Sequence, residues 1–129
     1  MKIHPHINLH PMPIVHQFIE LETREGIDLF DITPQVVELL ESTSVKNGQV
    51  LVFSQHTTTA LTIHENEERL WEDIRVYLKN LAPPENRYLH NDLHHPDVPP
   101  DEPINAHSHR MAITLSTSEV IPVVEGKLG

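Results

Sequence analysis

The sequence predicts a single domain of 129 residues that mixes short strands with helices. Several short runs of β-branched and aromatic residues are bounded by turn residues, which is typical of strands. One longer stretch carries apolar residues at every third or fourth position, which indicates a helix. A chain of this length buries roughly two-thirds of its unfolded surface, so one hydrophobic core is sufficient. We expect this domain at residues 14–129, after an extended arm at 1–13 whose prolines oppose helix formation.

Four short β-type runs are expected to form strands, at residues 14–23, 27–32, 49–54 and 118–124. Gly26 marks a turn between the first two runs, which together predict a hairpin. Pro122 cannot donate to a ladder, so the last strand is expected at an edge or at a bulge. Residues 125–127 predict the start of another hairpin.

Three helices are expected. The first begins at Thr33-Pro34, with the threonine hydroxyl as cap and proline at the first helical position. The longest runs from a cap at Asn66 to about Asn80 and presents an apolar stripe. Residues 82–104 form a long proline-rich connection without regular structure. After it, Asn105 caps a short helix from Ala106 to Leu115, for which an alternating strand is the rival interpretation.

Composition restricts the classes of partner. The formal charge is −10, from 19 acidic and 9 basic residues, which argues against binding to nucleic acid. No apolar run approaches the ~20 residues of a membrane span, and the N-terminus lacks the apolar core of a signal peptide. The chain has no cysteine, which fits a reducing compartment. We therefore expect a cytoplasmic protein without nucleic-acid or membrane partners.

The stretch from Tyr88 to Arg110 is unusually rich in histidine and acidic residues. Imidazole nitrogens and carboxylate oxygens are the usual ligands of zinc and similar divalent metals, so this density indicates a metal site. The alternative is that most of these histidines are solvated loop residues. The spacing from His90 to His94 is the one helical zinc spacing in the stretch, but it falls in a loop too rich in proline to be helical.

Five motifs in order resemble the YjbQ-like family, also called the secondary thiamine-phosphate synthase family; they lie at residues 56–60, 62–66, 88–91, 105–107 and 118–128. The resemblance covers nearly the whole chain after the arm. It implies an α+β fold, an antiparallel two-layer β-sandwich with two to three outer helices, assembled as a homotrimer. It also implies a cluster of histidines, onto which His56, His90 and His107 map.

The chain departs from the family pattern at two places. His64 stands where family members typically have Asn, which adds one potential ligand. The family pattern also continues past Gly129 into a further motif and a final strand, so either the sequence is truncated or this protein lacks one strand and its share of the pocket.

The family name implies the joining of a pyrimidine diphosphate to a thiazole phosphate, with loss of pyrophosphate. Such a reaction needs a divalent cation, zinc or magnesium, and donors for the leaving group. We expect His56, His90 and His107 as metal ligands. Glu65 or Asp73 is expected as a base or as a partner of the ligands. Contacts to a small phosphorylated substrate are expected from Thr57, Thr58, Asn66 and Lys127.

Other functions remain open from the sequence. An all-histidine site suits zinc better than magnesium, which favours metal-assisted hydrolysis or phosphoryl chemistry with a zinc-bound water as nucleophile. A trimer that binds a metal or a small molecule without turnover is a different class. A third possibility is that the histidines only join subunits at the trimer interface.

Overall fold

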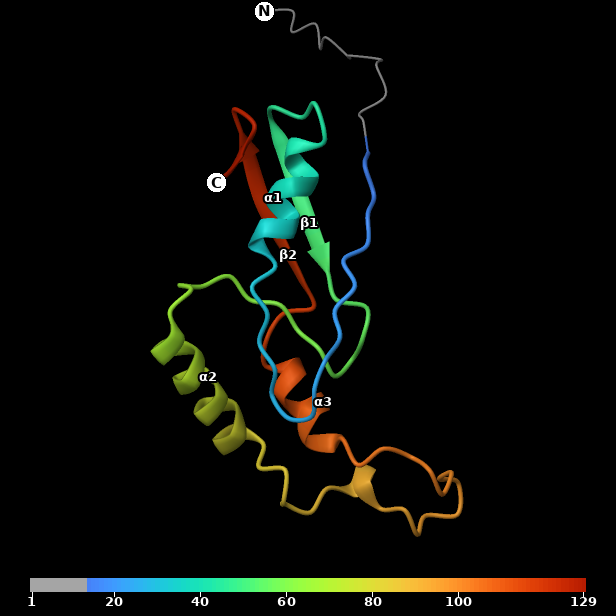
Figure 1. Cartoon of the computed structure of the whole chain (residues 1–129). Helices are drawn as coiled ribbons and strands as arrows, with labels where there is room; N and C mark the ends of the chain where they lie inside the picture. The colour runs from blue at the N-terminus through green and yellow to red at the C-terminus, as the bar shows by residue number, and fades with distance from the viewer. Residues whose placement is uncertain (1–13) are drawn as a thin grey trace, which may run out of the picture.

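The fold is described from a computed structural model, for residues 14–129; the arm predicted at 1–13 lies outside the described residues (Figure 1). Three α-helices, one short 3-10 helix and three strands occur in the described part of the chain, and the α+β class is confirmed. Their order is α1 (Thr33–Glu41), β1 (Gly48–Phe53), α2 (Glu68–Leu81), η1 (Leu89–Asn91), α3 (Ala106–Ile113), β2 (Ser118–Val124) and β3 (Lys127–Leu128). None of the described helices is both long and apolar enough to cross a membrane.

The three strands form one antiparallel sheet in the order β1-β2-β3. Leu51 pairs with Val120 in the register of β1 and β2. Glu125 and Gly126 join β2 to β3, and both have positive φ, at 52° and 79°. Two positive φ values are the mark of the type I′ turn, whose twist matches that of the strands. The predictions of the strands at 49–54 and 118–124 and of the final hairpin are confirmed.

Pro122 lies in the middle strand of the sheet, where an edge or a bulge was expected. The carbonyl of Pro122 accepts a hydrogen bond from Gly129 N at 2.8 Å, so this residue faces the β3 side. The nitrogen and the carbonyl of one strand residue point to the same side, so the N–H that proline lacks would have faced β3. The hydrogen bonds between β1 and β2 are therefore unaffected. The prediction of an edge strand was wrong, because β2 is the middle strand of the sheet. This strand tolerates Pro122 because β3 is only two residues long and its pairing with β2 ends close to this position.

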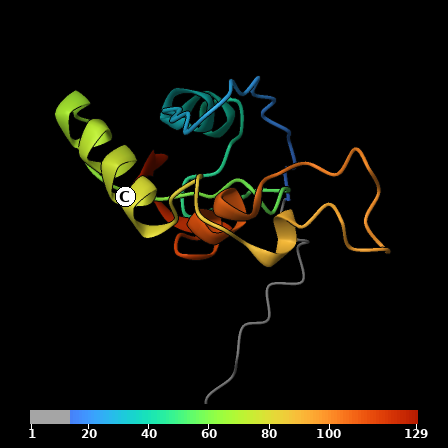
Figure 2. The same ribbon diagram turned by 90° about the horizontal axis from the view of Figure 1, so that it is seen from below.

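Helix α1 packs on one face of the sheet (Figures 1 and 2). Val36 and Leu40 of this helix are buried, and so is Val123 of β2. The opposite face carries four large apolar side chains that are 51–62% exposed, namely Leu51, Phe53, Val120 and Val124. The open sheet face is the name used below for these four residues.

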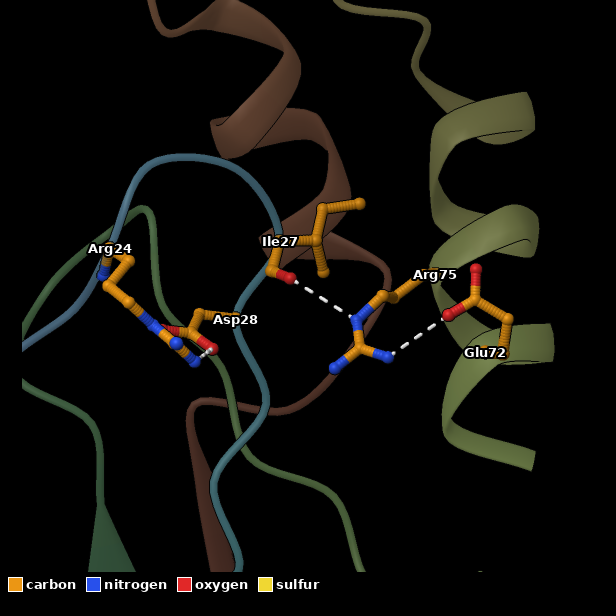
Figure 3. A network of polar contacts seen from close by, with 5 residues as sticks. All are labelled: Arg24, Ile27, Asp28, Glu72 and Arg75. Atoms are coloured by element: carbon orange, nitrogen blue, oxygen red, sulfur yellow. Dashed lines mark hydrogen bonds and ion pairs between the residues drawn. The ribbon is translucent and has the colours of Figure 1, made fainter. Parts of the chain in front are cut away.

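A second core lies between α2 and α3. Leu78, Ala82 and Met111 are buried there, and Ile27 and Ile74 pack against them. The chain at 24–28 is fastened to α2 by Arg75, whose Nε donates to the carbonyl of Ile27 at 3.4 Å (Figure 3). This small core fixes where α3 begins, and therefore where its first-turn side chains lie.

The hairpin predicted at residues 14–32 is wrong, because no strand forms there. Ile14 and Phe18 are 91% and 62% exposed. A β-type run becomes a strand only when another strand pairs with it, and none in the described part of the chain does.

The predicted helix starts need correction. Thr33 does not cap α1; its N–H donates instead to the carboxylate of Asp31 at 3.0 Å. Glu67 rather than Asn66 is the N-cap of α2 and accepts from Leu70 N at 2.7 Å. Carboxylates replace the expected hydroxyl and amide because they are strong acceptors for free N–H groups.

The helical interpretation of residues 106–115 is confirmed by α3, although its N-cap Asn105 makes no side-chain cap bond. The connection at 82–104 is not fully irregular, because it contains η1.

Candidate functional site

The clearest cluster of polar side chains joins η1 to the start of α3. His90 Nε2 lies 3.0 Å from Oδ1 of Asn105. Because an amide oxygen only accepts, the imidazole donates from Nε2 in this contact. The ring of His109 lies against that of His90, with centroids 5.1 Å apart and planes at 83°. The two rings therefore sit side by side, and one of them has a fixed tautomer.

Two further contacts hold this cluster in place. Asn91 Oδ1 accepts from Ala106 N at 3.1 Å, so a side chain of η1 satisfies the first amide of α3. Tyr88 donates its hydroxyl to the carbonyl of Pro83 at 2.7 Å and lies 5.4 Å beneath the guanidinium of Arg110. The His-Asn cluster, defined here as His90, Asn105 and His109, is thus flanked by two contacts between η1 and α3 or their neighbouring residues, namely the Asn91–Ala106 bond and the packing of Arg110 on Tyr88.

The residues predicted as metal ligands are not brought together. His56 is exposed in the loop after β1, His90 belongs to the His-Asn cluster, and His107 borders a different cavity. Over residues 14–129, no three histidine or carboxylate side chains are close enough to hold a metal ion. One described chain thus offers the neighbouring pair His90 and His109 but not the three protein ligands that zinc sites generally have. The fit to a resident metal is incomplete.

The predicted substrate-binding threonines lie in the loop that follows β1. Thr57 and Thr58 are exposed, and Thr59 N donates to the carbonyl of His56 at 3.3 Å. The hydroxyls of Ser54 and Thr59 are hydrogen-bonded, which ties the loop to the end of β1. Thr57 and Thr58 thus sit on an exposed turn and are available to a ligand.

The residues around 64–66 are exposed and form local bonds. His64 Nδ1 lies 2.7 Å from the carbonyl oxygen of Glu65, so this ring nitrogen donates. Asn66 donates from Nδ2 to Asp31 at 3.0 Å. The pKa of Asp31 is lowered, chiefly because Thr33 hydrogen-bonds to its carboxylate. Asn66 also lines an open hollow of about 430 Å³ beside Glu68, Trp71 and Arg75.

Asp73 and Lys127 lie apart from the His-Asn cluster in the fold. Asp73 is exposed on α2, and Lys127 is exposed on β3 at the far end of the sheet. The carboxylate of Asp73 has no hydrogen-bond or ion-pair partner within residues 14–129. The two carboxylates expected as catalytic, Glu65 and Asp73, are therefore not assembled with the histidines within the described chain.

The sequence did not single out Asn105 and His109 as site residues. Asn105 was interpreted as a helix cap, because an asparagine before an apolar helical pattern usually caps. His109 could have been found from its spacing, since it is one helical turn beyond Asn105 and so shares a face with it. His107 lies between them in sequence and points elsewhere.

Comparison with known proteins places this arrangement in a family. The family model described as UPF0047 protein YjbQ-like matches residues 17–129. A UPF0047 protein of Methanothermobacter thermautotrophicus is 37% identical over 117 residues, covering 91% of this chain and 76% of the relative. One of Archaeoglobus fulgidus is 39% identical over 110 residues, covering 85% and 78%. The chain belongs to the YjbQ-like UPF0047 family.

Solved structures agree. A YbjQ-like protein of unknown function from Sulfolobus solfataricus has a TM-score of 0.74 at 37% identity, covering 84% of this chain and 72% of the other. A hypothetical protein from Aeropyrum pernix has a TM-score of 0.67 at 36% identity, covering 78% and 68%. The family expected from the sequence motifs is confirmed.

Proposed function

We propose that the chain is a small-molecule enzyme of the transferase type that its family resemblance implies, with the His-Asn cluster as its reaction centre. The observation that carries the proposal is the bond between His90 and Asn105, beside the ring of His109. Two imidazoles from separate segments, one with its tautomer set by an amide, form a pair suited to moving or donating protons near neutral pH.

The proposed reaction joins a pyrimidine diphosphate to a thiazole phosphate. A carbon–nitrogen bond forms to the thiazole nitrogen, the carbon–oxygen bond to the diphosphate breaks, and pyrophosphate leaves with the bonding electrons. Negative charge develops on the leaving oxygen, so donors aimed at it lower the barrier. The imidazole N–H of His109 and the guanidinium of Arg110 would supply such donors. His90 holds the adjacent ring in place.

Metal dependence remains a prediction. Zinc or magnesium would neutralise the diphosphate oxygens, and His90 and His109 are the neighbouring imidazoles available to zinc. Further ligands would come from the substrate oxygens or from another subunit. Magnesium prefers oxygen ligands, so it would arrive with the diphosphate rather than reside on these histidines.

The test measures product formation with His109→Asn beside His94→Asn, in each case with metal content by elemental analysis. We expect His109→Asn to lower kcat by at least about a hundredfold, which is the usual contribution of a positioned proton donor. His94→Asn is the control, because His94 is exposed and makes no hydrogen bond or ring contact with the cluster within residues 14–129. Equal turnover in the two variants would contradict the proposal. Zinc that is retained by wild type and lost in His109→Asn would favour zinc-assisted hydrolysis as the alternative chemistry.

A second candidate is a homotrimer that binds a small molecule without turnover. The open sheet face supports self-association, because four large apolar side chains at 51–62% exposure lie together on two paired strands. Contiguous apolar patches of this kind typically mark interaction surfaces. Packing a second layer on this face would also produce the two-layer sandwich that the family resemblance implies.

A further inference from the structure

A cavity of about 100 Å³ lies between the end of α2, the first turn of α3 and the turn at Gly26. Water occupies about 30 Å³ per molecule in the liquid, so this space suits one small polar group rather than a whole cofactor. Ile27 and Met111 supply apolar wall, whereas Lys79, His107 and Ser108 supply polar groups. The cavity is separate from the His-Asn cluster.

The polar groups of the cavity are donors with positive or neutral charge. Lys79 is in the last turn of α2 and has no carboxylate within ion-pair distance in the described part of the chain. Ser108 contributes a hydroxyl from α3. The amides of His107 and Ser108 also lack an acceptor over residues 14–129, whereas the flanking amides of α3 bond to Asn91 and Asn105. The positive end of the helix dipole adds to this field.

The imidazole of His107 gives an independent indication. Its Nδ1 is buried and has no hydrogen-bond partner within residues 14–129. Buried polar atoms in native proteins almost always have a partner, so an orphan of this kind calls for one that the chain itself does not provide. A bound group that reorients the ring would satisfy it.

The wall opposite α3 is held in a fixed position (Figure 3). Arg75 donates to the carbonyl of Ile27 at 3.4 Å and pairs with Glu72 at 3.2 Å. Across the same turn, Arg24 makes an ion pair with Asp28 at 2.9 Å. Asp28 is thereby neutralised by a cation rather than left to repel an anion, and the turn is anchored to the helix that carries Lys79.

We propose that this cavity binds a phosphate group, either inorganic phosphate or the end of a small phosphomonoester. A phosphate carries close to two negative charges at neutral pH and accepts several hydrogen bonds, which suits an ammonium, a hydroxyl and free amides. The chain has a formal charge of −10, so an anion is held only where donors are concentrated.

Successive helical residues differ by about 100°, so His107 and His109 lie about 200° apart around α3. This inference therefore does not rest on the proposed catalysis.

The test is calorimetric titration of the full chain with inorganic phosphate and, separately, with glycerol 3-phosphate, at ionic strength matched with chloride. We expect saturable binding to wild type and about tenfold weaker binding to Lys79→Met, the usual effect of losing one charge-assisted hydrogen bond. Lys79→Arg should restore most of the affinity. Lys46→Met is the matched control, because Lys46 is exposed beside Gly126, at the end of the sheet away from the cavity.

The outcomes separate clearly. Equal affinity for both probes assigns the cavity to the phosphate group alone, and tighter binding of the ester assigns it to an organic phosphate that also contacts Ile27 and Met111. If wild type binds neither probe, or if Lys79→Met and Lys46→Met weaken binding equally, the proposal is overturned. Circular dichroism of each variant confirms that the fold is retained.

Discussion

His90 and Asn105 stand fifteen residues apart in the sequence, and their side chains meet at 3.0 Å between Nε2 and Oδ1. The contact closes the long connection between η1 and α3 and holds one ring by its Nε2. It is accompanied by the bond from Ala106 N to Asn91, so the same two segments are joined twice.

Replacing Asn105 tests this relationship. In Asn105→Ala the acceptor is lost, so we expect the Nε2–H tautomer of His90 to lose its preference and the free energy of unfolding to fall by about 1 kcal/mol. Imidazole nitrogen NMR at neutral pH reports the tautomer directly. Asn86→Ala, at an exposed position, is the control. An unchanged His90 spectrum in Asn105→Ala would show that the contact does not orient the ring.

Two leucines test where the core lies. Leu40 is 6% exposed on the buried side of α1, whereas Leu89 is 91% exposed at the start of η1. We expect Leu40→Ala to cost about 2–5 kcal/mol in the free energy of unfolding, because it leaves a cavity in a small core. Leu89→Ala should change it by less than about 0.5 kcal/mol. Urea denaturation measures both, and similar costs would contradict this assignment of the core.

Acidification should weaken the start of α2 through Glu67. The pKa of this carboxyl lies below its usual 4.5, first because Arg69 hydrogen-bonds to it and then because Leu70 N does so. Since the folded value is below the unfolded one, the charged form stabilises the fold. This stabilisation is complete above about pH 4.5 and is lost as the pH falls through the lowered folded value.

The measurement is the free energy of unfolding as a function of pH for Glu67→Gln and Glu68→Gln. We expect Glu67→Gln to remove part of the decline below pH 4.5 and to be the less stable of the two at neutral pH. Glu68 is the control, because it lies in the same first turn but does not cap. Profiles that overlap throughout would show that the Glu67 cap contributes nothing to the acid response.

Self-association should depend on the open sheet face. Leu51 is 62% exposed and pairs with Val120 of the neighbouring strand. A lysine there places a charge in any interface formed by this face, so Leu51→Lys should shift a trimer toward monomer in light scattering after gel filtration. Leu89 is also exposed, at 91%, but lies off the sheet, so Leu89→Lys should leave the mass unchanged. A monomeric wild type, or a trimer that persists in Leu51→Lys, would argue against this interface.

Local pattern by itself determined the two paired strands, the long helix and the family. In these segments the period of apolar residues and the turn at 125–126 agree with the tertiary fold, so the local sequence was sufficient to predict the secondary structure. Tertiary structure decided what pattern could not. Residues 14–23 have β-type composition but no partner strand, and pairing depends on segments distant in sequence.

The same reason explains the candidate site. The sequence located a stretch rich in histidine, but three of its side chains had alternatives that local rules could not separate. The side chain of Asn105 accepts a hydrogen bond from His90 and does not cap the helix. The ring that lies beside His90 is that of His109 and not that of His107. Which side of α3 faces η1 is set by the packing of Met111 against Leu78 and Ala82, a contact between segments far apart in the chain.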